Sequence, residues 1–258
     1  MEIAPLISVI TPLYNAEHFI EDTIRSLQKQ THKNWEVCIV DDASTDTSNA
    51  IVTRLAAEDS RIRLHTETEN RGAAYCRNKS TEMANGGFIA FLDADDLWHP
   101  EKLEKQLTFM MKKKSAVSYT NYLHMDETGT SFLKRVKALP VLSYRKQRTN
   151  NYIGNLTGMY NAEKLGKILA PNLRKRQDWA VWLTAIERSG APAMGLQEDL
   201  AYYRLRSGSI SENKWKLIPY NYQFYRSFLG FSTLKSTAYL LRFFWEYFIE
   251  RPRQFERL

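Results

Sequence analysis

Cysteine is scarce in this sequence, with only Cys38 and Cys76 among 258 residues. Neither belongs to a Cys-x-x-Cys pair or to a Cys/His spacing typical of metal ligands, which argues against a disulfide framework and a structural zinc site. Cys38 lies in a strand-like run and Cys76 in a helix-like run, so we expect both to be small core residues. A reducing compartment, the cytoplasm, is therefore the expected location.

Long uncharged apolar runs are absent too, because no stretch reaches the roughly 18 to 20 uncharged apolar residues that a membrane-spanning helix needs. No basic leader precedes the first apolar run, so Ile7–Thr11 is predicted to be a strand rather than part of a signal peptide. Disorder is excluded, since the sequence is 43% hydrophobic and 12% aromatic, as packed globular proteins are.

Positive charge is in surplus. The sequence has 36 Lys and Arg residues against 29 Asp and Glu residues, which gives a formal net charge of +7. Such a surplus favours an anionic partner: nucleic acid, acidic lipid headgroups or a phosphorylated small molecule. Composition does not choose among these three.

Strand-like and helix-like segments alternate in the first half of the chain. Strands are predicted at Ile7–Thr11, Trp35–Val40, Ile62–His65, Phe88–Leu92 and Ala116–Tyr122. Helices between them predict an α/β fold with a doubly wound parallel sheet and right-handed crossovers. Ligands of such sheets bind beyond the carboxyl ends of the strands. Three polar clusters follow those ends: Thr11–Asn15, Asp41–Asp46 and Asp93–Asp96.

The pattern loosens from about Asp126. The basic stretch Lys134–Asn151 is predicted to be a loop, Gln177–Arg188 an amphipathic helix, and the aromatic-rich tail from Trp215 helical. The simplest division is one large domain at residues 1–212 followed by a C-terminal helical segment at residues 213–258.

The acidic motif Asp93-Ala94-Asp95-Asp96 directly follows a predicted buried strand. Three carboxylates this close repel one another, and a divalent cation relieves that repulsion. Oxygen ligands at a strand end suit Mg²⁺ or Mn²⁺, which would bridge to a diphosphate. The same carboxylates could instead cap the helix that begins near Pro100, and the motif alone favours neither role.

Motifs at the neighbouring strand ends supply the context. Asp42 offers a carboxylate that can accept a hydrogen bond from a uracil imide or a ribose hydroxyl. Tyr14 offers a ring that can stack on a base. Gly72 and Arg77 place a permissive backbone and a guanidinium where a nucleotide could approach. Each has a plainer role in a turn, loop or cap, but their combination and order favour a nucleotide site.

Together these motifs resemble glycosyltransferase family 2, whose fold is the GT-A type: one nucleotide-binding α/β sheet with a mixed acceptor region. The resemblance covers roughly residues 5–210 and is closest to bacterial members that assemble capsule, teichuronic acid, lipopolysaccharide or exopolysaccharide. The matching segments are Ser8–Asn15, Val40–Asp46, Asn70–Asn78, Phe91–Trp98 and Arg176–Leu183. It implies an inverting enzyme, with residues 1–212 as catalytic domain, that moves a sugar from a UDP-sugar to a saccharide or lipid-linked saccharide acceptor with Mn²⁺ or Mg²⁺.

The resemblance also implies roles for single residues. Asp178 matches the catalytic base, Asp95 the metal ligand, and Asp93 a residue that reaches the ribose and shares the metal site. Direct displacement at an anomeric carbon does need a base and a stabilised diphosphate, although an Asp at a helix start is also a common cap. The implied nucleotide-sugar-binding residues are Pro12, Tyr14, Asp42, Gly72, Arg77, Asp93, Ala94, Asp95 and Arg204.

Two positions depart from the family's pattern. Gln177 stands where Glu often precedes the base, and Arg206 stands where many members carry a histidine. An imidazole metal ligand is therefore not expected, and Arg204 or Arg206 is expected to contact diphosphate oxygens instead.

The tail segment Leu234–Ile249 leaves alternatives open. It could lie in a membrane interface at the inner face of the cell membrane, or pack against the catalytic domain or a second subunit. A sugar-phosphate nucleotidyltransferase is a competing enzyme class, but it usually has a Gly-rich loop where Pro12-Leu13-Tyr14 stands here. A nucleic-acid-binding protein would leave the carboxylates at the strand ends unexplained, so no nucleic-acid partner is expected.

Overall fold

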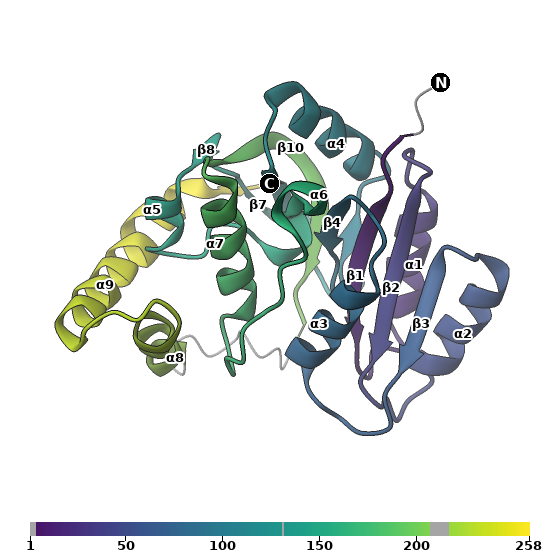
Figure 1. Cartoon of the computed structure of the whole chain (residues 1–258). Coiled ribbons are helices and arrows are strands. Elements are labelled where there is room, and N and C mark those ends of the chain that lie inside the picture. Colours follow the sequence, from purple (N-terminus) through teal and green to yellow (C-terminus); the bar gives the residue numbers. More distant parts are fainter. Residues whose placement is uncertain (1–3, 131, 207–216) are drawn as a thin grey trace.

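The computed structural model describes residues 4–130, 132–206 and 217–258 of the chain (Figure 1). Across these residues runs a single mixed sheet. In order across the sheet, its main path is β11 (Phe255–Arg257), β7 (Phe132–Val136), β6 (Val117–Met125), β9 (Met159–Asn161), β4 (Phe88–Phe91), β1 (Ile7–Leu13), β2 (Trp35–Asp41) and β3 (Ile62–Thr66). Off this path, β10 (Ala193–Arg204) pairs with β6, β5 (Leu97–Trp98) and β8 (Val141–Leu142).

The strands β4, β1, β2 and β3 are mutually parallel, as the alternating sequence pattern predicts. Every residue of β2 is buried, and so is every residue of β1 except Pro12. Such continuous burial requires a sheet that is covered on both faces. Successive side chains of β1 alternate accordingly, because Ile7 and Val9 belong to one core cluster and Ile10 to another.

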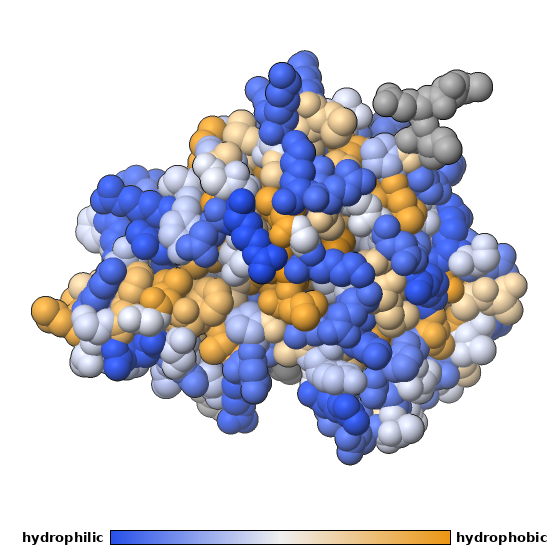
Figure 2. All heavy atoms as spheres, viewed as in Figure 1, coloured by the Kyte–Doolittle hydropathy of each residue, from blue (hydrophilic) through white to orange (hydrophobic). Residues whose placement is uncertain are grey.

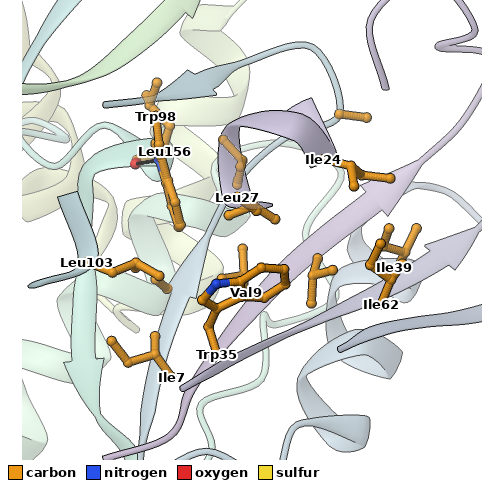
Figure 3. Packing of buried hydrophobic residues seen from close by; sticks show 14 of the residues in the cluster. Ile7, Val9, Ile24, Leu27, Trp35, Ile39, Ile62, Trp98, Leu103 and Leu156 are labelled. Carbon is orange, nitrogen blue, oxygen red and sulfur yellow. Dashed lines mark hydrogen bonds between the residues drawn. The ribbon is translucent and has the colours of Figure 1, made fainter. Parts of the chain in front are cut away.

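Helices cover both faces of these parallel strands. On one face lie α1 (Ile20–Gln28), α2 (Ser48–Glu58) and α4 (Lys102–Lys113), whose apolar residues share a core with β1 and β2. Figure 3 shows Ile24, Leu27 and Leu103 around the buried ring of Trp35. The other face is covered by α3 (Ala73–Met83) and α7 (Gln177–Ser189).

The second half of the chain adds antiparallel strands, with β9 against β4 and β6, and β7 against β6. The prediction that Lys134–Asn151 is a loop is wrong, since this stretch contains the end of β7, the strand β8 and the helix α5 (Tyr144–Gln147). β8 pairs with β10, about fifty residues further along, so no local periodicity marks it. The remaining short elements are η1 (Asn155–Thr157) and α6 (Ala162–Leu165).

The tail is helical, as predicted, for most of its described length. Its elements are α8 (Ile218–Gln223), the π-helix η3 (Phe224–Phe228), α9 (Thr233–Trp245), the π-helix η4 (Glu246–Glu250) and η5 (Arg251–Gln254). The final strand β11 pairs antiparallel with β7 and was not anticipated. The predicted boundary at residue 212 lies outside the described residues. Among those described, no helix is both long and apolar enough to span a bilayer.

Aromatic stacking fastens this tail to α7. Trp179 is fully buried and stacks on Phe224 at 4.2 Å between ring centroids, and Phe243 of α9 lies 6.0 Å away. These rings form a third core cluster with Tyr225 and Phe231. The tail therefore covers one side of the helix that begins at Gln177.

Gly158 offers a test of this packing. Its backbone angles are ordinary (φ −78°, ψ 149°), but a Cβ atom there would clash with the buried ring of Trp182. We expect Gly158→Ala to lower the free energy of unfolding by about 1–3 kcal/mol, since overpacking strains a dense core. Urea denaturation measures the loss. In the double variant with Trp182→Phe the loss should be smaller than the sum of the two single losses, and strict additivity would contradict the proposed clash.

Candidate active site

The carboxyl ends of β1 and β2 are tied together by their loops. Asn15 and Ala43, which follow these strands, both have positive φ angles, 45° and 56°. The Asn15 N–H donates to Ser44 Oγ at 3.0 Å, and its side-chain Oδ1 accepts from the Thr45 N–H at 2.9 Å. The two polar clusters predicted at these strand ends thus form one bonded surface. Tyr14 stands on it with half of its surface exposed, so its ring is free to stack on a planar ligand.

Asp42 is the buried anchor of the next loop. Its side chain is only 3% exposed, its Oδ1 accepts from the Arg71 N–H at 2.7 Å, and its Oδ2 accepts from the Gly72 N–H at 2.8 Å. Gly72 has φ 88° and ψ 156°, a conformation that favours glycine, and α3 begins directly after it. Asp42 therefore shapes the loop beside the predicted base pocket.

Arg77 links α3 to the acidic motif. Its NH2 group lies 3.0 Å from Asp93 Oδ1, and the Asn155 amide donates to the same oxygen at 3.4 Å. The Nε of Arg77 is buried and has no hydrogen-bond partner among the described residues. The structure thus brings together the predicted residues Arg77 and Asp93, and it adds Asn155, which the sequence did not single out.

Asp95 and Asp96 have different surroundings. Asp96 is 1% exposed and accepts the Arg204 backbone N–H at 2.9 Å, so it holds the end of β10. Asp95 pairs through Oδ2 with Nε of Arg206 at 2.8 Å. Burial, and next the nearby carboxylate of Asp93, raises the pKa of Asp95; burial, and next Asp95, raises that of Asp96.

The two candidate arginines are also distinct. Arg204 is 4% exposed and donates to the backbone carbonyls of Asp95, at 2.8 Å, and of Glu127, at 2.6 Å. Its NH2 group is buried without a partner among the described residues. Arg206 is more exposed and faces the carboxylate of Asp95. Arg206 is thus the more accessible cation, and Arg204 is a buried residue that supports the backbone of the acidic motif.

The donor set fits a hard divalent cation. Burial is the main cause of the raised pKa values of Asp95 and Asp96, and repulsion among the neighbouring carboxylates adds to it. Within the described ranges, no group of three or more His, Cys, Asp or Glu side chains is arranged to hold a metal. Mg²⁺ commonly needs only one or two protein carboxylates, with phosphate oxygens and water as its other ligands. Asp95 and Asp93 can supply those carboxylates.

Asp178 lies at the start of α7 and is half-buried. Its Oδ2 accepts from the Asn151 amide at 2.7 Å, and Asn151 Oδ1 accepts from Gln147 Nε2 at 2.9 Å. Trp179 Nε1 donates to the Gln147 carbonyl at 2.7 Å, which closes the network. Asn151 and Gln147 were missed because they lie in the stretch predicted to be a loop.

The short segment from Asn151 to Asn155 contacts both Asp178 and the acidic motif. Asn151 binds Asp178, and Asn155 binds Asp93. Four residues of chain span at most about 14 Å, so the two hydrogen-bonded asparagines keep Asp178 and Asp93 in one region of the protein.

The fold and the site define an α/β protein whose parallel strands end in carboxylates, with antiparallel strands added to the same mixed sheet. The family model described as glycosyl transferase family 2 matches residues 8–165. The glycosyltransferase TuaG of Bacillus subtilis (strain 168), named for teichuronic acid biosynthesis, is 46% identical over 233 residues, 90% of this chain and 92% of that protein. The chain belongs to glycosyltransferase family 2, which sets aside the nucleotidyltransferase alternative.

Other known proteins agree with this assignment. The Escherichia coli UDP-Glc:alpha-D-GlcNAc-diphosphoundecaprenol beta-1,3-glucosyltransferase WfgD is 38% identical over 82% of this chain and 81% of its own length. The crystal structure of S. aureus TarS 1–349 with UDP-GlcNAc superposes with a TM-score of 0.71 over 94% of this chain and 73% of that one, at 22% identity. The mannosyltransferase PcManGT from Pyrobaculum calidifontis, with GDP-Man and Mn²⁺, gives 0.64 over 93% and 72%, at 18% identity. The predicted GT-A fold is confirmed.

The anchoring role of Asp42 can be tested without any ligand. Asp42→Asn keeps one acceptor oxygen but sets an NH₂ donor against a backbone N–H. We expect a loss of about 1–3 kcal/mol in stability, because a buried donor is left unpaired. Hydrogen exchange of the Arg71 and Gly72 amides should accelerate. The exposed Asp22→Asn is the matched control; if both variants exchanged alike, Asp42 would not be the anchor.

Proposed function

We propose that this protein is an inverting, metal-dependent glycosyltransferase that moves a sugar from a UDP-sugar to a lipid-linked saccharide during assembly of a bacterial surface polysaccharide. The observation that carries the proposal is the carboxylate of Asp178, held by Asn151 in the same short segment whose Asn155 binds Asp93 of the acidic motif. The names of the relatives support donor and acceptor, since WfgD is named for UDP-Glc and a diphosphoundecaprenol acceptor and TarS was solved with UDP-GlcNAc.

Asp178 acts as the base in this proposal. Because Asn151 occupies Oδ2, the other oxygen is available to accept the proton of the acceptor hydroxyl. As the acceptor hydroxyl loses its proton, its oxygen attacks the anomeric carbon, and the bond from that carbon to the diphosphate oxygen breaks. The new glycosidic bond forms on the face opposite the leaving UDP, so the anomeric configuration inverts.

The donor lies over the ends of β1, β2 and β4. Tyr14 stacks on the uracil, Asp42 positions the base through the loop it anchors, and Asp93 reaches the ribose. The backbone of Gly72 leaves room for the nucleotide, since a Cβ there would have open space around it. The other members of the proposed donor site are Pro12, Arg77, Ala94, Asp95 and Arg204.

Asp95, with Asp93, would hold the divalent cation, Mn²⁺ or Mg²⁺. When bound, this cation neutralises charge on the departing diphosphate. Arg206 now pairs with Asp95. The guanidinium of Arg206 is accessible and can also bind diphosphate oxygens as a charge-assisted donor.

A cytoplasmic location fits the same proposal. Both cysteines are free and buried, and burial raises the pKa of the Cys38 thiol to about 12, so it is an unreactive core residue. The protein then meets its lipid-linked acceptor at the inner face of the membrane.

Calorimetry with a panel of nucleotide sugars tests the donor class. We expect UDP-glucose, UDP-galactose or UDP-GlcNAc to bind more tightly with Mn²⁺ present, and GDP-mannose not to bind. Asp95→Asn should weaken the metal-dependent component about tenfold or more, and electron paramagnetic resonance of Mn²⁺ reports metal binding directly. Asp22→Asn should match the wild type. A complete lack of metal-dependent response to any UDP-sugar would refute the donor assignment.

The base assignment has its own test. We expect Asp178→Asn to lower kcat by about 10²–10⁴-fold, the usual contribution of a general base, while UDP-sugar affinity stays unchanged. Asn151→Ala should lower kcat less and shift its pH profile, since Asn151 only positions the carboxylate. Glu187→Gln, on the exposed far end of α7, is the control. An Asp178→Asn enzyme with wild-type turnover would exclude this residue as base.

A further inference from the structure

An apolar stripe runs along the exposed side of the C-terminal helices. Leu234 is 83% exposed and Leu241 65% exposed, and the stripe continues through Trp245 and Phe248. Their spacing of seven, four and three residues places them on one helical face. Ile249 adjoins its end, also exposed. In Figure 2, hydrophobic surface gathers at the left end of the molecule, where Figure 1 shows α9.

The opposite face of α9 is firmly packed. Phe243 and Ser236 are buried, and Phe243 lies against Trp179 of α7. The stripe therefore cannot turn inward without breaking this aromatic cluster. Its exposure is a property of the folded chain rather than of a frayed end.

Positive charge predominates around the stripe. Between Thr233 and Trp245 the helix carries Lys235 and Arg242 and has no acidic residue. Glu246, the next residue, is fully buried and is bound by Lys146 at 2.6 Å and by Arg242 at 2.8 Å, which neutralise its charge. Glu250, at the end of η4, pairs with Arg253.

A cavity of about 560 Å³ lies beside the stripe, between α5 and α9. Three cations line it, Arg145, Lys146 and Arg242, together with the hydroxyl groups of Ser143 and Thr149. The carboxylate of Glu246 also lines it and is bound by Lys146 and Arg242, so the cations remain in surplus. Guanidinium and ammonium groups with hydroxyl neighbours form a chemical environment suited to a phosphate.

We propose that α9 and η4 lie in the interface of an anionic membrane, with the stripe among the acyl chains and the α5–α9 cavity against phosphate headgroups. A helix with aromatic and leucine residues on one face and basic residues beside them binds such interfaces, and each basic residue near the surface adds attraction. A second copy of the chain fits less well, because pairing two stripes would bring Lys235 of both copies together, while the carboxylate of Glu246 is already bound by Lys146 and Arg242.

The membrane contact extends the proposed function, and its biological purpose depends on that function. Phe243 touches Trp179, and Trp179 adjoins Asp178. A membrane bound by α9 would therefore lie close to the residue proposed as base, where a lipid-linked acceptor has to present its hydroxyl group.

Vesicle co-sedimentation with the full chain tests the inference. We expect binding to vesicles with about 30% phosphatidylglycerol and little binding to neutral phosphatidylcholine, with the difference lost at high salt. The triple variant Leu241→Gln, Trp245→Gln, Phe248→Gln should lose about tenfold or more of this binding. Lys235→Gln with Arg145→Gln should weaken binding to the anionic vesicles alone. The control replaces exposed apolar residues elsewhere: Met111→Gln, Leu133→Gln and Leu169→Gln.

The outcomes separate the alternatives. Equal vesicle binding by wild type and triple variant, or no binding by wild type, would overturn the inference. Concentration-dependent dimers that the triple variant abolishes, without vesicle binding, would assign the stripe to a second copy. UDP-sugar binding by the triple variant, equal to wild type, shows that the variant is folded. If the wild type bound vesicles but no nucleotide sugar, the proposed function would fail while the membrane contact stood.

Discussion

Mutual repulsion among the carboxylates at the end of β4 is the constraint around which the rest of the structure is arranged. Arg77 reaches Asp93 from α3, while Arg204 and Arg206 reach the Asp95–Asp96 pair from the end of β10. Because β10 also pairs with β6, these contacts join the parallel half of the sheet to the antiparallel half. They do so at the proposed donor site.

The parallel strands could be predicted because both of their faces are buried, so their sequences are continuous apolar runs that stop at polar clusters. The elements between Lys134 and Asn151 could not. β8 is two residues long and α5 is four, too short for any periodicity to show. Their stability comes from partners far along the chain, as with β11, which pairs with β7 across more than one hundred residues.

For the site, acid motifs at strand ends predicted which carboxylates gather, since strand direction alone brings those ends together. The sequence could not predict which groups form hydrogen bonds or ion pairs with these carboxylates. The partners of Asp42 are backbone amides, which every residue carries. The difference between Arg204 and Arg206 arises from their positions, because Arg204 is the buried last residue of β10 and Arg206 lies beyond the end of the strand. The contact of Asn151 with Asp178 could not be predicted, because the sequence around Asn151 shows neither helical nor strand periodicity.

Two adjacent residues of the short helix α5, Lys146 and Gln147, contact different regions of the protein. Lys146 binds Glu246 of the tail, while Gln147 holds Asn151 and, through it, Asp178. The position of the tail and the orientation of the Asp178 carboxylate therefore share one rigid element. Coupling between two sites is reciprocal, so a ligand or surface that changed the affinity at Asp178 by shifting η4 would itself be bound more or less tightly, by the same factor, when the proposed acceptor site is occupied. The far end of the chain would then contribute to the energetics of that site although none of its residues needs to touch the sugar.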